Sequence, residues 1–595
     1  MMDTRGIHLG AVPPPVDQAR GSTGSPAGPG LSTDRRPSPP GAATSLRFDD
    51  ATLDAGLTLA PGLYFGGSWV DLDGDGDLDL TIPVDSDRNG CLRVWENDGG
   101  RFVEVTEALG LGCVPFARSA AWIDLDDDGD LDLYLTRRSF AGTNLVFENQ
   151  GGFLVPHAVP ELETPATDVT QAWADFDGDG DLDLYLPAVI VTAQRLLLRD
   201  GPFEFRDVAS TVGLDAEATA VAGAWADYDE DGDPDLAVGL ATGIRLYRNE
   251  GGVRFEDVTG AATELSGFLI VPSWADADAD GDLDLLAGGF FPPRLFENRH
   301  SDGEESFRDR TADWGSGFAG STGGSWVDLD LDGDLDLLGD GGSGGPQVHR
   351  NDIPEGGQLV DVTREAGLPY TPGIGWQPIA GDFDGDGGPD FLVPHEAGRA
   401  LYRNASELRG RWVQLRLVAA GGGPAVGARV RYEDGPALQV REIAFPGAGF
   451  GFASADVGLA LGRRGAANRV EVRWPSGREE IFHGLAGGRL HVLREGSGST
   501  RRPALSATPT ATLEADCNPC RRAVRFTVRD ADGRPAPSLL VYDARGRLVR
   551  ALPAASGTAS WDLRAADGRL VPAGVYWVQT ARGRLGPGTR LVVLR

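Results

Sequence analysis

Asp71-Leu-Asp73-Gly-Asp75-Gly76-Asp77-Leu-Asp79 is the first of seven Asp-rich loops that recur along this chain. The repeat period runs from 49 to 54 residues, because the other loops begin at Asp124, Asp175, Asp227, Asp276, Asp328 and Asp382. A near-constant period of this length is typical of a propeller or solenoid, in which each repeat is one supersecondary unit. The loop therefore bears on both the fold and the chemistry.

Each repeat contains the same short segments in the same order. An F-x-D strand and a short A-G-L segment precede a W-x-D loop, an apolar strand and an L-x-x-N end. Gly-rich residues join each L-x-x-N end to the next F-x-D strand, which predicts a β-hairpin. We expect the F-x-D copy at Phe48 to pair with the seventh repeat and close the ring. The strand ends are placed at Asn97, Asn149, Asp200, Asn249, Asn298, Asn351 and Asn404.

The predicted fold class is all-β, with five parts along the chain. Residues 1–45 are rich in Pro, Gly and Ser and are expected to be disordered. Residues 46–408 hold the repeats and predict a seven-bladed β-propeller. Residues 409–496 alternate apolar and polar and predict a small β domain. A Ser/Thr/Pro/Ala stretch at 497–515 is interpreted as a linker, and 516–595 as an Ig-like β-sandwich.

Charge is distributed unevenly along the chain. The net charge is -35, and 36 of the 89 acidic residues lie in the seven loops, so the remainder is close to neutral. A nucleic-acid partner is excluded because phosphate binding needs clustered positive charge. All 54 basic residues are Arg, which excludes mechanisms that need a Lys. Residues 409–496 carry 13 Arg against 8 acids, and 497–595 carry 16 against 7. This excess suggests docking on the acidic propeller or on an anionic cell envelope.

The four cysteines and the apolar segments bear on where in the cell the protein could be located. Cys91 and Cys113 could form a disulfide if the fold brings them together, and Cys517 and Cys520 form a C-x-x-C that is either a local disulfide or two thiols. No apolar run is long enough for a transmembrane helix. The first 30 residues lack the apolar segment of a secretory signal, which conflicts with the extracellular location proposed below.

The loops have the residue types that a hard divalent cation needs. Carboxylates alternate at loop positions 1, 3, 5 and 9, and Gly at position 6 permits the sharp turn that curls them around one point. Flexible oxygen coordination of this kind suits Ca²⁺, with position 7 supplying its backbone carbonyl. About seven Ca²⁺ sites are therefore predicted. Their ligands are Asp71, Asp73, Asp75, Asp77 and Asp79; Asp124, Asp126, Asp128, Asp130 and Asp132; Asp175, Asp177, Asp179, Asp181 and Asp183; Asp227, Asp229, Asp231, Asp233 and Asp235; Asp276, Asp278, Asp280, Asp282 and Asp284; Asp328, Asp330, Asp332, Asp334 and Asp336; and Asp382, Asp384, Asp386, Gly388 and Asp390.

Each of these motifs also has a simpler interpretation. The loops could be solvated Asp-rich turns, or the ions could be purely structural. The Trp two residues before six of the loops could stack on a sugar, but its regular placement favours packing between blades; in the seventh repeat Trp376 is displaced. Asp85 to Glu96 fits an EF-hand pattern without helices, and Gly341 to Gly345 fits G-x-S-x-G without a following helix. No catalytic or cofactor-binding residue is predicted.

The D-x-D-x-D-G-D-x-D loops resemble FG-GAP/VCBS repeats of integrin α-like propellers. Val470-Glu-Val-Arg-Trp-Pro-Ser-Gly477 resembles the ASPIC/UnbV domain, and the combination resembles bacterial members of the cartilage acidic protein family. Val541 to Val549 and Gly574-Val-Tyr576 are similar to FlgD-type Ig-like or sorting modules. The resemblance implies an extracellular or cell-surface calcium-binding scaffold for adhesion to an unknown protein or glycan. A calcium-dependent glycan- or phosphoester-processing enzyme and a structural envelope protein are the alternatives; the oligomeric state is open.

Overall fold

The computed structural model describes most of the chain after residue 45. The described ranges are 46–57, 66–84, 91–137, 142–163, 170–188, 194–214, 219–259, 269–289, 293–301, 307–315, 324–339, 345–368, 378–393, 401–406, 412–433, 438–443, 454–500, 512–515, 523–529, 538–542, 548–553, 558–565, 569–580 and 589–593. The predicted disordered segment 1–45 lies outside them.

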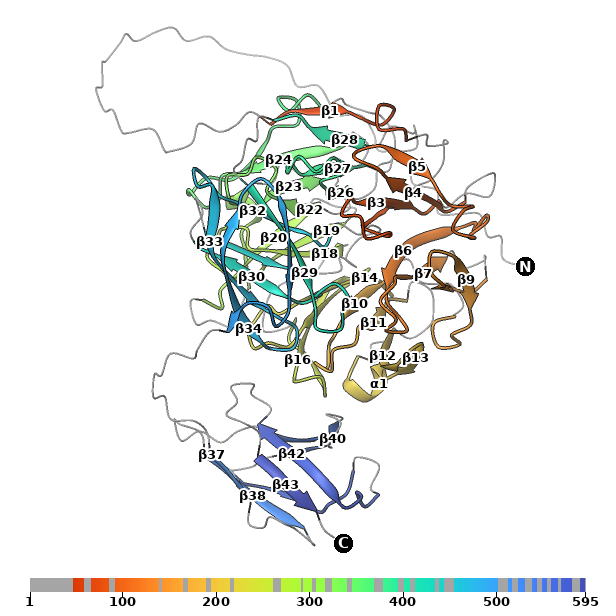
Figure 1. Ribbon diagram of the computed structural model, residues 1–595. Helices are drawn as coiled ribbons and strands as arrows, with labels where there is room; N and C mark the ends of the chain where they lie inside the picture. The colour runs from red at the N-terminus through yellow and green to blue at the C-terminus, as the bar shows by residue number, and fades with distance from the viewer. Residues whose placement is uncertain are drawn as a thin grey trace, which may run out of the picture. The chain divides into compact units, whose positions relative to one another are not determined.

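The repeats form four-stranded antiparallel sheets, and the fold is all-β and β-propeller-like (Figure 1). Within the described residues the repeat region has seven such sheets, six built from consecutive strands and the seventh completed by β1. They are β2–β5 (Ser68–Val70, Asp79–Ile82, Arg93–Asn97, Phe102–Glu104), β6–β9 (Ala117–Ile123, Asp132–Arg137, Leu145–Asn149, Leu154–His157), β10–β13 (Ala172–Ala174, Asp183–Leu186, Arg195–Gly201, Glu204–Asp207), β14–β17 (Ala220–Ala226, Asp235–Leu240, Gly243–Asn249, Phe255–Asp257), β18–β21 (Leu269–Ala275, Asp284–Gly289, Arg294–Asn298, Phe307–Asp309), β22–β25 (Gly324–Val327, Asp336–Gly339, Gln347–Asn351, Leu359–Asp361) and β26–β28 (Ile379–Gly381, Asp390–Leu392, Leu401–Asn404) with β1 (Phe48–Asp50).

The first strand completes the last sheet. β1 pairs with β28 in antiparallel register, with Phe48 opposite Asn404 and Asp50 opposite Tyr402. In the other sheets the same outer position belongs to a strand of the following segment, as where Phe102 lies opposite Asn97. The pairing predicted for Phe48 is therefore confirmed, and it joins the two ends of the repeat region.

Apolar side chains pack between neighbouring sheets. The second strand of each repeat is buried along almost its whole length, as in Leu80, Leu133 and Leu184, each 0% exposed. The Trp side chains lie at these contacts, and four of them donate the indole N–H to the preceding repeat, as Trp225 does to Ala172 O at 3.2 Å; the others of this kind are Trp69, Trp122 and Trp274. Packing between repeats, predicted for these tryptophans, is confirmed at this position.

Residues 412–500 form two sheets around a separate core. In the first, β29 (Trp412–Val418) pairs antiparallel with β32 (Val457–Ala460) and parallel with β35 (Leu490–Arg494). The second has the order β31-β30-β33-β34-β36. Its strands are β30 (Arg429–Tyr432), β31 (Gln439–Glu442), β33 (Ala466–Arg473), β34 (Glu479–Ala486) and β36 (Ser499–Thr500). Trp474, Tyr432 and Val470 are buried in the core between them.

The C-terminal strands form two further antiparallel sheets with their own core, which includes Trp561 and Phe526. β36 and β37 extend into both ends of the predicted linker 497–515, while the domain boundaries themselves stay predictions. The strands are β37 (Thr512–Ala515), β38 (Val524–Arg529), β39 (Ser538–Tyr542), β40 (Leu548–Pro553), β41 (Thr558–Trp561), β42 (Gly574–Thr580) and β43 (Thr589–Val593).

In the part of the chain that the structure describes, helix is almost absent and one disulfide is formed. α1 (Ala209–Val212) and α3 (Thr311–Trp314) are single turns. Among the described residues no helix has the length and apolarity needed to cross a membrane. Cys91 and Cys113 form the predicted disulfide and connect the second repeat's entry segment to the first repeat. Cys517 and Cys520 lie outside the described residues.

Candidate metal centres

The Asp-rich loops share one backbone conformation, and the sequence pattern predicts only part of it. Gly at position 6 has positive φ in all seven loops, from 88° to 112°, as the pattern predicts. Position 4 is also left-handed, and there Gly occurs in only three loops. Asp127, Glu230, Ala279 and Leu331 adopt φ of 57° to 64° instead. An L-residue in this region is held against its preference by the surrounding structure.

Positions 1, 3 and 9 bring carboxylates together. In four loops one oxygen from each of these three positions lies within 4.8 Å of the other two, as in Asp71, Asp73 and Asp79. In the fifth loop the close group is Asp276, Asp278 and Asp280, and two further groups of this kind exist among the described residues. The predicted ligands at positions 1, 3 and 9 therefore converge in four loops, and those at positions 1, 3 and 5 converge in the fifth. The other three groups are Asp124, Asp126 and Asp132; Asp175, Asp177 and Asp183; and Asp227, Asp229 and Asp235.

The Asp at position 9 organises its loop. Its Oδ2 accepts the backbone N–H of position 2 in every loop, at 2.7 to 3.3 Å. Its Oδ1 accepts a backbone N–H from the next strand at 2.7 to 2.9 Å. Burial raises the pKa of Asp79 and of Asp132 to about 7 despite these bonds. This carboxylate is thus a structural member of each loop as well as a candidate ligand.

Positions 5 and 7 serve the loop in a different way. The carboxylate at position 5 is exposed in all seven loops, and its Oδ1 accepts the N–H of position 7, as Asp75 does at 2.9 Å from Asp77. The carboxylate at position 7 turns toward the neighbouring hairpin, where Asp77 accepts from Gly99 N at 2.8 Å. The Asp77 carboxylate is therefore engaged outside the carboxylate group, and ligation by the backbone carbonyl of position 7 stays a prediction.

The carboxylate groups fit a hard cation. Buried oxygens without a hydrogen-bond partner in the described structure occur on Asp124, Asp130, Asp227, Asp276 and Asp334. A buried oxygen anion without a donor or counter-ion is costly, so each is a position where a cation fits. Burial, reinforced by neighbouring carboxylates, raises the pKa of Asp175 and of Asp231 to about 8. A divalent cation would reverse this shift, because it favours the charged form.

The L-x-x-N residue connects adjacent repeats, a role that the sequence pattern did not reveal. Asn351 Nδ2 donates to Leu335 O of its own loop at 3.0 Å and to Ala277 O of the preceding repeat at 2.8 Å. Asn97, Asn249, Asn298 and Asn404 make the same pair of bonds.

In the third repeat the predicted strand end, Asp200, is wrong by one residue. Arg199 N is the group that donates to Asp183 Oδ1, and the Arg199 guanidinium reaches Leu125 O of the preceding repeat at 2.9 Å. The cause is a register shift between Arg199 and Gly201, which leaves Asp200 on the surface paired with Arg206 at 2.8 Å.

Arginines from residues 412–500 contact the loops of the repeat region. Arg416 pairs with Asp71, and Arg473 pairs with Asp227. Arg429 donates to Glu230 Oε1 at 2.6 Å. These are ion pairs of the kind that the excess of Arg in this region suggested.

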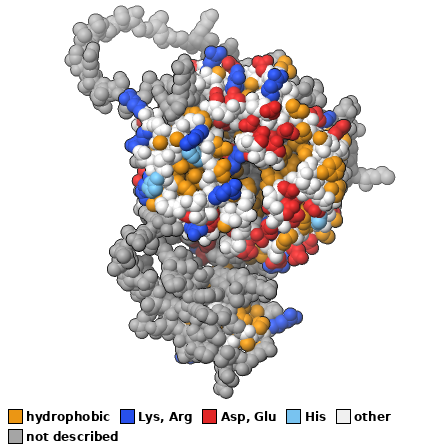
Figure 2. Space-filling view, in the orientation of Figure 1, with side chains coloured by type: hydrophobic (Ala, Val, Ile, Leu, Met, Phe, Trp, Pro, Cys, Tyr) orange, Lys and Arg blue, Asp and Glu red, His pale blue; other side chains and the backbone are white. Residues whose placement is uncertain are grey.

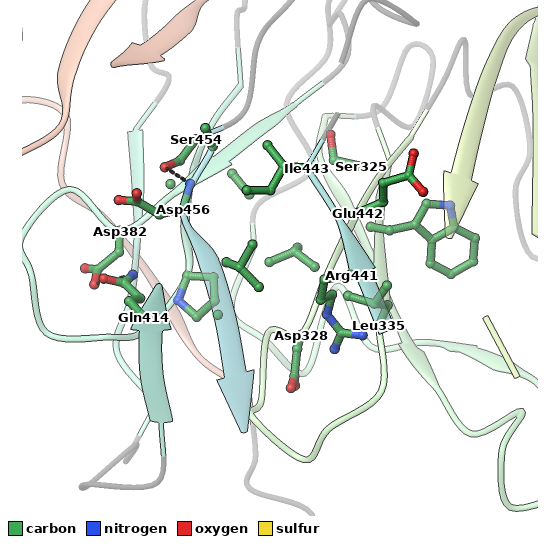
Figure 3. Close-up of a pocket in the computed structure, with 18 of the residues that line it drawn as sticks. Ser325, Asp328, Leu335, Asp382, Gln414, Arg441, Glu442, Ile443, Ser454 and Asp456 are labelled. Atoms are coloured by element: carbon green, nitrogen blue, oxygen red, sulfur yellow. Dashed lines mark hydrogen bonds between the residues drawn. The ribbon is translucent and has the colours of Figure 1, made fainter. Parts of the chain in front are cut away.

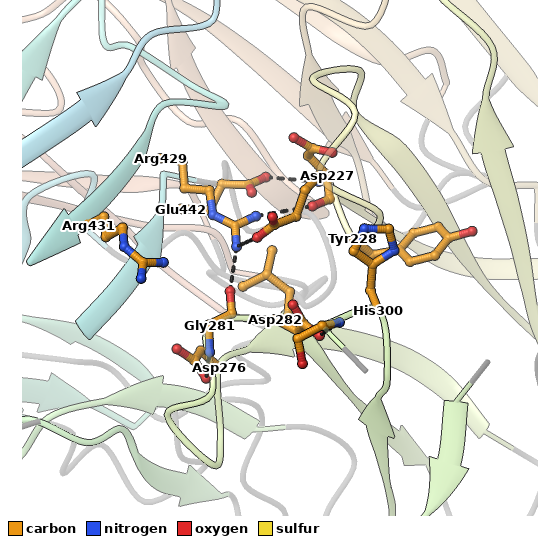
Figure 4. A network of polar contacts seen from close by, with 12 residues as sticks. Asp227, Tyr228, Asp276, Gly281, Asp282, His300, Arg429, Arg431 and Glu442 are labelled. Carbon is orange, nitrogen blue, oxygen red and sulfur yellow. Dashed lines mark hydrogen bonds and ion pairs between the residues drawn. The ribbon is translucent and has the colours of Figure 1, made fainter. Parts of the chain in front are cut away.

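The position-6 carbonyl is a recurrent target of the same arginines. Arg429 donates to Gly281 O at 2.5 Å (Figure 4), and Arg441 donates to Gly333 O at 3.2 Å. Arg416 approaches Gly76 O at 3.5 Å. At the seventh loop Trp412 lies against Gly387, where an added Cβ would stand 1.7 Å from the indole.

Five of the loops are therefore contacted by residues 412–500 (first, fourth, fifth, sixth and seventh). Within the described residues, no such contact is made to the second and third loops. Figure 2 shows acidic side chains clustered on the exposed surface of the repeat region. Position 6 is buried at Gly281, Gly333 and Gly387 but exposed at Gly129 and Gly180.

Three sequence features lie outside the described residues. These are Trp376, most of the EF-hand-like stretch from Asp85, and Gly341 to Gly344 of the G-x-S-x-G match. Nothing in the structure bears on their predicted roles.

Comparison with protein families supports the two motif-based resemblances. The chain matches the model of the FG-GAP-like repeat over residues 71–135, 124–186 and 227–287, and the ASPIC and UnbV model over residues 420–500. It therefore contains FG-GAP-like repeats followed by an ASPIC/UnbV-like domain. No curated protein matches the chain in sequence.

Solved structures of low similarity span much of the chain. An Agrocybe aegerita lectin that recognises non-reducing terminal N-acetylglucosamine is 15% identical, covering 67% of this chain and 95% of its own, with a TM-score of 0.34. The V. cholerae biofilm matrix protein Bap1 is 12% identical, covering 91% and 96%, with a TM-score of 0.29. A Lactobacillus plantarum protein is 12% identical, covering 53% and 87%, with a TM-score of 0.34. At these TM-scores the likenesses carry no argument about function.

Proposed function

We propose that this protein is an extracellular or cell-surface scaffold whose repeats form a seven-bladed propeller held together by Ca²⁺ and bind another macromolecule. The observation that carries the proposal is the convergence of carboxylates at positions 1, 3 and 9, with buried oxygens left without a partner. Those residues and the position-7 carbonyl would hold the ion. The ion would supply the positive charge that the buried carboxylates lack.

Free-energy estimates favour a structural role for the ions. Extracellular calcium modules bind with Kd of roughly 10⁻⁴–10⁻³ M. With free ion tenfold above Kd, each site adds about 1.4 kcal/mol to the free energy of unfolding. Seven sites together add about 10 kcal/mol, comparable with the ~5–15 kcal/mol of a whole domain. Calcium would then decide whether the repeat region is folded.

We also propose a family and an activity for this protein. We assign the chain to the cartilage acidic protein family and its last strands to a FlgD-like, Ig-like module, on the motifs quoted above. The proposed activity is binding of a protein or glycan, without catalysis. The loops that residues 412–500 leave open, at Asp124 and Asp175, are the part of the loop surface available to such a partner.

Calcium removal tests the proposal most directly. Thermal unfolding is recorded with calcium, with a calcium chelator, and with chelator followed by excess calcium. We expect chelation to lower Tm strongly and readdition to restore it. A matched sample with Mg²⁺ in place of Ca²⁺ controls for nonspecific charge screening, and an unchanged Tm after chelation would refute the calcium assignment.

A further inference from the structure

A cavity of ≈ 270 Å³ lies where the fourth to seventh repeats meet residues 412–500 (Figure 3). Trp225, Trp274 and Trp326 line it from three successive repeats, and Arg441 and Glu442 line it from β31. A single water needs only about 10–15 Å³ of such volume, so the cavity is many times larger than one water and lies just below the lower end of the range of small-molecule pockets, near ~300 Å³. The cavity therefore has room for a small organic molecule.

Three polar atoms of lining residues are buried without a hydrogen-bond partner in the described structure. They are Trp326 Nε1, Ser273 Oγ and Glu442 Oε2. The other oxygen of Glu442 accepts from Asp227 N at 3.3 Å, so one carboxylate oxygen is used and one is free. Buried polar atoms in native proteins nearly always have a partner, so these three atoms are positions where a bound molecule or water would form hydrogen bonds.

Trp326 differs from its counterparts in the other repeats. The indole N–H of Trp274 donates to Ala224 O at 3.3 Å, and that of Trp122 donates to Thr81 Oγ1 at 2.9 Å. Trp69, Trp173 and Trp225 also have acceptors. In addition, Trp69, Trp122, Trp173 and Trp225 are at most 4% exposed, whereas Trp274 and Trp326 are half-buried. Thus two of these tryptophans retain open surface at the cavity.

The chemistry of the free atoms restricts the ligand. The indole N–H needs an acceptor and the carboxylate oxygen needs a donor, and a hydroxyl group supplies both. An organic cation without an oxygen could pair with Glu442 but would leave the Trp326 N–H without an acceptor. The other charges of the lining are already engaged, since Arg441 donates to Gly333 O and Asp456 accepts from Arg416 at 2.8 Å. Asp328 and Asp382, which also line the cavity, accept backbone N–H groups of their own loops. A neutral molecule with several hydroxyls and an apolar face fits this set.

We propose that the cavity binds a pyranose, as a free monosaccharide or as the terminal sugar of a glycan, with Trp274 and Trp326 against its ring and Glu442 and Ser273 on its hydroxyls. This deepens the proposed binding function by naming the ligand class, and it rests on residues 412–500 staying docked on the repeats.

Calorimetric titration and tryptophan fluorescence test this site on the full chain in calcium. The probes are a panel of neutral monosaccharides and the matching disaccharides, which separate a free sugar from a glycan terminus. We expect at least one sugar to bind and to change the fluorescence. Trp326→Phe and Glu442→Gln should each weaken binding about tenfold or more, as expected for a lost hydrogen bond to a charged or buried group.

Trp122→Phe is the matched control, because its indole N–H is bonded within the fold and lies outside the cavity. It should lower Tm and leave the sugar Kd unchanged. Trp326→Phe should instead raise the sugar Kd and leave Tm unchanged. Ser273→Ala provides a second variant that removes a lining hydroxyl. If no sugar binds while calcium still raises Tm, the cavity holds water only. The sugar-binding proposal is then overturned, and the calcium proposal is not. Binding that is indifferent to both Trp326→Phe and Glu442→Gln would also overturn it.

Discussion

Two sets of loops share one sequence pattern but have opposite surroundings. In the loops around Gly281, Gly333 and Gly387, position 6 is buried under residues 412–500, whereas Gly129 and Gly180 are exposed. The bonds within the loops are nevertheless alike, with the position-9 carboxylate accepting two backbone N–H groups in both sets. The loop conformation is therefore set by bonds within the loop. Residues 412–500, which cover some of the loops, bind groups that the loop already directs outward.

The cover uses arginine on groups that a cation site leaves free. Arg429 and Arg441 donate to position-6 carbonyls, which belong to the turn and not to the carboxylate group. Arg473 instead pairs with Asp227 at position 1, and the bond from Gly232 N seen at this position in other loops is not among its contacts. Arg416 pairs in the same way with Asp71 at position 1 of the first loop. In the first and fourth loops, therefore, docking would compete with a bound cation for the position-1 carboxylate.

The largest expected contrast comes from one substitution made in both sets. Gly180→Ala and Gly387→Ala each place a side chain at positive φ, which costs about 1–3 kcal/mol. At Gly387 the new Cβ would also collide with Trp412, whereas nothing lies within 4 Å at Gly180. We expect Gly387→Ala to be destabilising by roughly a further 1–3 kcal/mol and to increase protease cleavage around residue 410. Equal losses in chemical denaturation would show that Trp412 does not dock there.

A second contrast separates docking from surface ion pairing. Arg473→Met leaves Asp227, which is 4% exposed, without its partner, so we expect a loss of about 2–4 kcal/mol. Arg469→Met is the control, because its pair with Glu471 lies on the surface and should contribute about 0–1 kcal/mol. Denaturant unfolding of both variants measures the difference. Similar values for the two would mean that the Arg473 contact does not hold residues 412–500.

The smallest expected effect is a pH dependence common to both sets. Burial raises the pKa of Asp132 in an open loop and of Asp382 in a covered loop to about 7. Without calcium these groups stabilise the fold below pH 4, and that stability is lost as pH rises through about 7. With calcium bound the charged form is favoured instead. The Tm difference between calcium and chelator should therefore widen from pH 5 to pH 8, and a narrowing gap would contradict the cation assignment.

Much of the fold followed from regular spacing. The recurrence of the loop, the hairpin signal and the isolated copy at Phe48 predicted repeated β units and the pairing of β1 with β28, because each of these is a local pattern repeated in register. The single error in strand ends, Asp200 for Arg199, arose at a bulge, since one extra residue shifts the ladder without changing composition. The seven blades and the Ig-like module stay predictions.

The sequence by itself determined the ligand types, their order in each loop and the glycine that lets them converge, because these depend on neighbours within nine residues. Only the tertiary structure decided which loops are covered and which tryptophan lacks an acceptor. Arg473 and Asp227 are 246 residues apart, and Trp326 and Glu442 of β31 line the same cavity from distant parts of the chain. Such contacts depend on how separately folded sheets pack, and no local pattern records that packing.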